Sequence, residues 1–207
     1  MSTAPPPLAA DLTAGLKRLK MAAMRRLAPE LLVTAKTQRW SPEEFLRTLV
    51  EAEITAREES NARNRMRQAS FPVGKSLADF DVTGSSIPPA TFSYLASLEW
   101  IRGAENACFI GPPGTGKSHM LVALGVAAVE AGHRVRYFTA ADLAETLYRA
   151  LADNSVGSVI DNLLRNDLLL VDLCRPCNYA DAGGPAPMVG LVSGGLRGPE
   201  LGIVPWL

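Results

Sequence analysis

The sequence predicts an α/β protein in which a parallel β-sheet carries helices on both faces, preceded by a small all-α domain. Between residues 106 and 172, short apolar segments alternate with helical segments, and this order is typical of a parallel sheet. A glycine-rich turn joins the first of these strands to the helix that follows it. In residues 11–70, apolar side chains instead recur at helical spacing, which indicates a separate helical domain.

Composition limits the function classes. The chain has 207 residues, of which 47% are hydrophobic and 20% charged. These values exclude a wholly disordered chain, and a pI of about 6.7 argues against a strongly basic nucleic-acid binder. No apolar run approaches the roughly 18 residues of a membrane helix, so we expect no membrane partner. Residues 1–10 do not resemble a signal peptide, and three cysteines favour a cytoplasmic location.

The formal net charge of zero is an average over unlike parts. Residues 1–80 carry 13 Lys and Arg against 9 Asp and Glu, whereas residues 81–207 carry 8 against 12. Glycine and proline are concentrated near the end of the chain, where residues 173–207 contain 7 glycines and 5 prolines. The last segment is therefore a different kind of sequence from the rest.

The N-terminal part begins with a lead, residues 1–10, that we predict to be disordered. An apolar stripe from Leu12 to Leu27 then indicates a helix, which Pro29 should end or kink. Ser41 can cap a second helix, and Glu44 completes a capping box with it. We expect that helix to reach Gln68.

Residues 71–105 read as a connector, and residues 106–172 as the α/β core. The connector should contain a short helix over residues 91–100. In the core the sequence predicts strands over residues 107–110, 135–139 and 168–171, and helices over residues 117–131, 141–152 and 156–166.

The turn after the first strand, residues 111–118, reads GPPGTGKS. It matches the phosphate-binding pattern GxxxxGK[ST], known as Walker A, in the required position between a strand and a helix. Glycines let successive backbone N–H groups surround phosphate oxygens, and the helix start adds partial positive charge. Lys117 should reach the β- and γ-phosphates, and the Ser118 hydroxyl should ligate Mg²⁺.

The third strand ends in an acid, Asp172, which fits a Walker B position that holds Mg²⁺ through water. ATPases of this type usually carry a second acid directly afterwards, which orients the attacking water. Leu173 occupies that place in this chain and cannot perform the task.

Other patterns carry less information. Cys174 and Cys177 have redox or half-zinc spacing, but there is no second CxxC and the chain has only two histidines, His119 and His133. A four-ligand zinc site therefore cannot be assembled from one chain, and no catalytic residue set can be argued. The basic runs at residues 17–26 and 63–67 suit either a solvated helix face or contacts with DNA phosphates.

The sequence resembles the IstB-like ATP-binding proteins, which are helper ATPases of insertion-sequence transposition and are related to the DnaC helicase loaders. The resemblance runs over about residues 12–172. It is carried by the segments LKRLKMAAM (16–24), SPEEFL (41–46), EAEITARE (51–58), FPV (71–73), LADFD (77–81), GPPGTGKSH (111–119), TAADL (139–143) and DLLLVD (167–172).

The resemblance implies a P-loop NTPase core of the AAA+ type that binds ATP and Mg²⁺. It further implies assembly as a homo-oligomer on duplex DNA and delivery of the target to a partner transposase. Asp172 and Ser118 would then hold the metal. The nucleotide would be held by Gly111, Pro112, Pro113, Gly114, Thr115, Gly116, Lys117, Ser118 and His119.

The resemblance stops at Leu173, and residues 173–207 show none of the sensor, arginine or lid elements of the family. We therefore expect a core incomplete at its C-terminus, followed by a truncated or frameshifted tail, and impaired hydrolysis. In this fold a sensor strand lies between the first and third strands, so its loss leaves backbone groups without partners. We expect a loose tail; the alternative is that residues 188–192 or 201–205 fill the gap.

Two other functions stay open. A working helicase-loader ATPase in replication is one, although its N-terminal segments usually differ from those found here. The other is a DNA-binding or interaction module that uses only the N-terminal helices and hydrolyses nothing.

Overall fold

The computed structural model describes residues 5–85, 87–112, 114–173, 188–194 and 201–205, with backbone alone for the last two ranges. It divides into two compact units, residues 1–61 and 62–207. The predicted disordered lead falls partly on residues 1–4, which lie outside the described residues.

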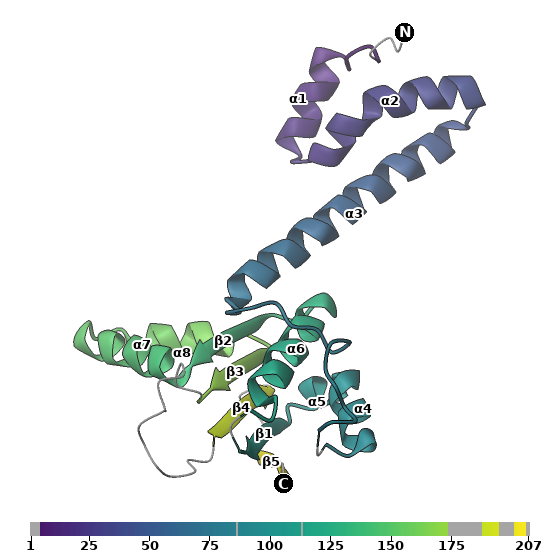
Figure 1. Ribbon diagram of the computed structural model, residues 1–207. Coiled ribbons are helices and arrows are strands. Elements are labelled where there is room, and N and C mark those ends of the chain that lie inside the picture. The colour runs from purple at the N-terminus through teal and green to yellow at the C-terminus, as the bar shows by residue number, and fades with distance from the viewer. Residues whose placement is uncertain (1–4, 86, 113, 174–187, 195–200, 206–207) are drawn as a thin grey trace. The chain divides into compact units, whose positions relative to one another are not determined.

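The first unit is built from helices (Figure 1). α1 covers Ala10–Arg18, α2 covers Ala22–Gln38, and α3 covers Pro42–Ala69, of which residues 42–61 belong to this unit. Met24, Ala28 and Leu49 form its small buried core, against which Leu8, Leu16, Met21, Leu31 and Phe45 pack.

The single helix predicted from Leu12 to Leu27 is interrupted between α1 and α2. Lys20 adopts a left-handed backbone conformation (φ 58°), which a helix interior does not tolerate. Pro29 instead lies inside α2, which continues to Gln38. Of the two effects expected of Pro29, the end of the helix is wrong and the kink stays a prediction. The predicted capping box is confirmed: the Glu44 N–H donates to Ser41 Oγ at 3.1 Å, and the Ser41 N–H donates to Glu44 Oε2 at 3.3 Å.

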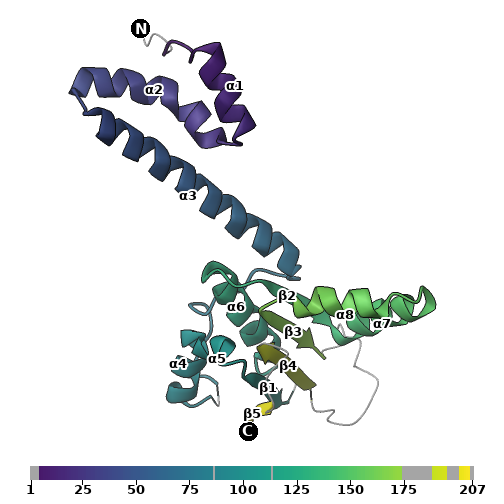
Figure 2. The ribbon, with the colours of Figure 1, turned by 180° about the vertical axis from the view of Figure 1, so that it is seen from behind.

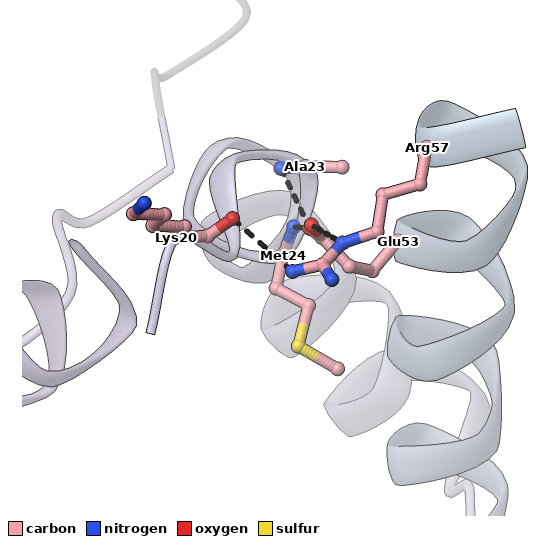
Figure 3. A network of polar contacts seen from close by, with 5 residues as sticks. All are labelled: Lys20, Ala23, Met24, Glu53 and Arg57. Carbon is pink, nitrogen blue, oxygen red and sulfur yellow. Dashed lines mark hydrogen bonds and ion pairs between the residues drawn. The ribbon is translucent and has the colours of Figure 1, made fainter. Parts of the chain in front are cut away.

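A buried carboxylate ties α2 to α3 (Figure 3). Glu53 Oε2 accepts the backbone N–H groups of Ala23 and Met24 at 2.9 and 3.0 Å. Arg57 donates to Glu53 Oε1 at 3.0 Å and to the Lys20 carbonyl at 3.3 Å. Since the first N–H groups of a helix have no partner within it, Glu53 caps α2 from a neighbouring helix.

The second unit contains a five-stranded sheet of order β2-β3-β4-β1-β5. The strands are β1 (Asn106–Gly111), β2 (Val135–Thr139), β3 (Leu168–Asp172), β4 (Met188–Gly194) and β5 (Leu201–Pro205). The helices are α4 (Pro89–Ser97), α5 (Glu99–Arg102), α6 (Lys117–Glu130), α7 (Ala140–Ala152) and α8 (Val156–Leu164).

α6 packs on the sheet, and α7 and α8 lie beside β2 (Figures 1 and 2). The core includes Trp100, Phe109, Met120, Leu121, Leu124, Leu168 and Leu170, each at most 2% exposed. The alternating strands and helices predicted for residues 106–172 are thus present.

Two expectations about the C-terminal segment are wrong. β4 lies between β1 and β3, pairing with both, and β5 pairs with the other edge of β1, so these two stretches are not a loose tail. β4 runs antiparallel to its neighbours, so the sheet is mixed rather than wholly parallel. The physical reason is that the backbone groups on the facing edges of β1 and β3 need hydrogen-bond partners. A strand between them can supply these partners whether it runs parallel or antiparallel.

Candidate nucleotide-binding site

The predicted phosphate-binding loop connects β1, which ends at Gly111, to α6, which begins at Lys117. Gly114 and Gly116 have φ values of 81° and 85°, a region that residues with a Cβ rarely enter. Gly116 is also the N-cap of α6. The sequence therefore places glycine at the two described positions where the loop backbone requires it; Pro113 lies outside the described residues.

Lys117 is buried at the start of α6, with only 6% of its surface exposed. Its Nζ donates to the Pro112 carbonyl and, at 3.1 Å, to Thr115 Oγ1. Thr115 Oγ1 in turn donates to the Pro112 carbonyl at 2.9 Å. Burying an ammonium group is unfavourable unless acceptors surround it. The two loop acceptors therefore hold the charge of Lys117 near the N-terminus of α6.

Asp172 lies at the end of β3 and is 6% exposed as a residue. The Tyr137 hydroxyl donates to its Oδ2 at 3.0 Å. Tyr137 belongs to β2, which pairs in parallel with β3 so that Thr139 lies beside Asp172. This hydrogen bond orients the carboxylate at the edge of the sheet where both strands end.

Strand register brings the loop and the acid to the same edge of the sheet. Asp172 and Phe109 both pair with Gly190 of β4, one from each side, and Gly111 pairs with Met188. Asp172 therefore lies level with a residue two positions before the loop. With one strand between them, β1 and β3 are about 10 Å apart, which a phosphate chain with its metal can span.

The described groups fit a nucleotide with Mg²⁺. A helix N-terminus preceded by left-handed glycines suits phosphate oxygens, and Lys117 adds a full positive charge. Mg²⁺ prefers oxygen ligands and is usually held by one or two carboxylates together with substrate phosphates. Ser118 and Asp172 supply such oxygens, and the described residues contain no cluster of three or more His, Cys, Asp or Glu that would suit a different metal centre.

His119 turns toward the connector. Its Nε2 lies 3.4 Å from the Ser76 carbonyl oxygen, and its ring meets Phe80 edge-on at 5.5 Å between centroids. Phe80 also stacks on Phe92, with centroids 6.1 Å apart. The imidazole therefore fastens α6 to the connector, and a direct contact between His119 and the nucleotide stays a prediction.

Phe80 and Tyr137 are site residues that sequence reasoning missed. A Cβ on Gly116 would lie 3.1 Å from Phe80 Cε2, so this ring supports the loop closely. Beyond it, the Thr83 hydroxyl and the Gly84 N–H lower the pKa of Asp81, and these hydrogen bonds hold the turn that follows Phe80. The available signal for Tyr137 was its place in a buried strand, where a phenol needs a partner for its hydroxyl.

A second feature, in the first unit, is a pocket of about 240 Å³ at the α1–α2 turn, with exposed basic residues around it. Its lining includes Lys17, Lys20 and Arg25, together with Leu16, Met21 and Ala22. None of the three cations forms an ion pair with a carboxylate among the described residues. The wall of the pocket is mostly apolar, and the three exposed cations place positive charge beside it.

The predicted CxxC pair, Cys174 and Cys177, lies outside the described residues, as do most residues between β3 and β4. Leu173, which follows Asp172, is described and is 43% exposed. Among the described helices, none combines the length and apolar character that a membrane crossing requires.

Comparison with known proteins places these features in a family. The family model of the IstB-like ATP binding protein matches residues 14–182, ten residues beyond the boundary that we expected at residue 172. Over 158 residues, or 76% of this chain, an ATP-binding protein of insertion sequence IS21 from Pseudomonas aeruginosa is 34% identical.

Two further relatives agree with that match. An insertion-sequence ATP-binding protein from Sinorhizobium fredii is 30% identical over 76% of the chain. The ATP-binding protein of insertion sequence IS5376 from Geobacillus stearothermophilus is 29% identical over 75%. The chain spans between 53% and 62% of the length of these three relatives. Because the family model covers most of the chain and includes the phosphate-binding loop, this chain belongs to the IstB-like ATP-binding proteins.

Proposed function

We propose that this chain is an ATP-binding helper of DNA transposition, which binds duplex DNA and a partner transposase in an ATP-dependent way in the cytoplasm. The observation that carries the proposal is the shared sheet edge, where Lys117 at the start of α6 and Asp172 at the end of β3 both lie. The relatives named above, which are ATP-binding proteins of insertion sequences, support the assignment to transposition.

In this proposal, the loop from Gly111 to His119 surrounds the phosphates, and Lys117 neutralises the charge of the terminal ones. Ser118 and Asp172 hold Mg²⁺. When bound, the metal would neutralise charge on the phosphates and fix their orientation.

Lys117→Ala tests the nucleotide site. Loss of a charge-assisted hydrogen bond is worth about 1.5–3 kcal/mol, so ATP affinity should fall about 10- to 100-fold in titration calorimetry. Lys36→Ala, which removes an exposed lysine from α2, should leave affinity unchanged. Equal binding by the Lys117 variant and the unmodified chain would overturn the nucleotide assignment.

We propose further that ATP is bound with little turnover. Leu173 cannot accept a proton or orient water, although it directly follows the metal-binding carboxylate. Phosphate release by purified protein should therefore stay at background level in a preparation that binds ATP. Steady release that Lys117→Ala abolishes would contradict this.

The exposed cations Lys17, Lys20 and Arg25 at the α1–α2 turn are the proposed DNA contacts. Each phosphate contact steepens the fall of log affinity with log salt by about 0.9 on duplex DNA. Replacing Lys17, Lys20 and Arg25 together by alanine should weaken DNA binding and reduce that slope by up to about 3. Arg149→Ala, at a cation of α7 that is paired with Glu145, is the control and should leave the slope unaltered.

Two alternative functions can be separated from this one. A transposase gene beside this gene favours the transposition helper over a replication loader. An interaction module that uses only the N-terminal helices would bind DNA equally well with Lys117→Ala, whereas the proposed function requires ATP to strengthen DNA binding.

A further inference from the structure

Tyr137 and Asp172 lie on the face of the sheet that α6 covers. Alternate residues of a strand share a face, so Asp172 lies on the same face of β3 as Leu170. A Cβ added to Gly125 of α6 would meet Leu170 Cδ1, so this face is turned toward α6. Leu170 pairs with Tyr137, and Asp172 pairs with Thr139. The tyrosine and the carboxylate are therefore diagonal neighbours on adjacent strands, and the hydroxyl reaches Asp172 Oδ2 at 3.0 Å.

The ring of Tyr137 is fixed by packing. It is buried in the core of the second unit, and Phe71 meets it edge-on with 6.3 Å between centroids. Side chains in close-packed cores occupy single rotamer minima, so the hydroxyl of Tyr137 has a defined position. The hydrogen bond to Asp172 is itself buried. The carboxylate therefore accepts from a rigid donor that is shielded from bulk water.

We propose that Tyr137 is a positioning residue that makes the nucleotide site favour Mg²⁺, an inference that rests on the proposed function of ATP binding. Its hydroxyl acts through Asp172 by fixing the orientation of the carboxylate that holds the metal. Hydrogen bonds to metal-binding groups orient those groups, and loss of one typically lowers metal affinity about 10- to 100-fold. The tyrosine itself touches neither the metal nor the phosphates.

The preference for Mg²⁺ follows from what each ion demands of its ligands. Mg²⁺ requires near-ideal octahedral geometry at about 2.0–2.1 Å and keeps several waters, whereas Ca²⁺ accepts oxygens at about 2.3–2.6 Å in flexible arrangements. A carboxylate that holds a water of Mg²⁺ is bound by the same octahedral geometry. Losing the fixed orientation of Asp172 should therefore weaken the binding of Mg²⁺ more than the binding of Ca²⁺.

Tyr137→Phe in the full chain tests this inference, because it keeps the packed ring and removes only the hydroxyl. ATP affinity is measured by titration calorimetry with excess Mg²⁺, with excess Ca²⁺ and with EDTA. The ratio of ATP affinities with and without a metal reports the coupling between metal and nucleotide. Comparing this ratio between the variant and the unmodified chain cancels the binding of the metal to free ATP.

The ratio for Mg²⁺ should fall about 10-fold in Tyr137→Phe, and the ratio for Ca²⁺ should fall less. The affinity in EDTA should be unchanged, because the hydroxyl acts on the metal and not on the phosphates. A merely structural role of Tyr137 would instead lower all three affinities together.

Two further variants show whether the hydroxyl acts through Asp172. Asp172→Asn should itself reduce the ratio for Mg²⁺, and adding Tyr137→Phe to it should cause no further fall, since coupled residues are not additive. Tyr94→Phe is the matched control: its hydroxyl also donates to a carboxylate, that of Glu105 at 2.8 Å. Glu105 directly precedes β1, at the opposite end from the phosphate-binding loop, so all three affinities should match those of the unmodified chain.

Four results would each overturn the inference and leave the proposed function standing. They are a ratio for Mg²⁺ that stays constant or rises in Tyr137→Phe, a ratio for Ca²⁺ that falls as far as that for Mg²⁺, an equal loss of affinity in EDTA, or a further fall in the double variant. Absence of ATP binding by the unmodified chain under all three conditions would overturn the proposed function and this inference together.

Discussion

Glu53 is a buried carboxylate that stabilises the start of α2. The backbone N–H of Met24 lowers its pKa below the ordinary 4.5, with Arg57 and Ala23 adding to the effect while burial opposes it. Glu53→Gln removes the charge from these hydrogen bonds, and charge-assisted bonds are worth about 1.5–3 kcal/mol. A fall of that size in the free energy of unfolding should appear in urea titration followed by circular dichroism at neutral pH, whereas the exposed Glu51→Gln should change little.

The same residue predicts a pH dependence. Because the pKa of Glu53 is lower in the folded than in the unfolded chain, its contribution to stability is complete above the unfolded value of 4.5. It is lost as the pH falls from there through the folded-state pKa. The difference in stability between the unmodified chain and Glu53→Gln should therefore shrink below pH 4.5. A difference that stays constant down to pH 2 would contradict the role of the ionised carboxylate.

At the residue scale, the sequence predicted the residues of the phosphate-binding loop better than the residues of other elements that contribute to the site. The glycines of the loop and Lys117 follow from a spacing rule, because phosphate binding constrains neighbouring positions along the chain. Phe80 and Tyr137 were missed because they reach the site from a connector and another strand, and no local spacing links them to it. The turn of His119 toward Ser76 and Phe80 was missed for the same reason.

At the element scale, the contact between α6 and β3 depends on a glycine. A Cβ on Gly125 would lie 2.5 Å from Leu170 Cδ1 and 2.7 Å from Phe71 Cε1, closer than atoms can pack. Gly125→Ala should therefore push α6 off the sheet and lower the free energy of unfolding by about 1–3 kcal/mol in thermal or urea denaturation.

Gly157→Ala is the matched control for this substitution. Gly157 lies in α8, where an added Cβ would come within 4 Å of no atom of the described residues, and alanine in a helix is favoured over glycine by about 0.5–1 kcal/mol. This variant should be as stable as the unmodified chain or slightly more stable. Equal effects of the two substitutions would show that α6 does not pack closely at Gly125.

The ends of helices were predictable where capping chemistry is local. The box of Ser41 and Glu44 is present, because both partners lie within one turn. Of the two effects expected of Pro29, the end of the helix is wrong, because α2 begins only at Ala22 and continues to Gln38. The break occurs instead at Lys20, where the chain turns so that α2 can pack its core residues and receive the cap from Glu53.

At the scale of the whole molecule, the sheet depends on a strand from the C-terminal segment. Every N–H of a strand flanked on both sides points at one neighbour or the other, whereas an edge strand leaves about half of them to solvent. Val192→Pro in β4, which pairs with Ala107 and Leu170, removes a ladder hydrogen bond and should lower the free energy of unfolding by about 1–3 kcal/mol, because it leaves a buried partner unsatisfied. Val204→Pro in the edge strand β5 should cost less, and urea denaturation compares the two. If neither variant were less stable than the unmodified chain, β4 and β5 would not contribute to the sheet, and the expected loose tail would be correct.

The sequence by itself determined the helical first unit, the alternation of strands and helices in residues 106–172, and the phosphate-binding loop. Each of these depends on interactions between residues close in the chain: helical spacing, a capping box, glycines before a helix. Only the tertiary structure decided what fills the space between β1 and β3, and that β4 enters it antiparallel. Strand pairing joins residues about 80 positions apart, such as Gly111 and Met188. The backbone groups on the facing edges of β1 and β3 need a strand between them. No local pattern within β4 indicates that this segment supplies it.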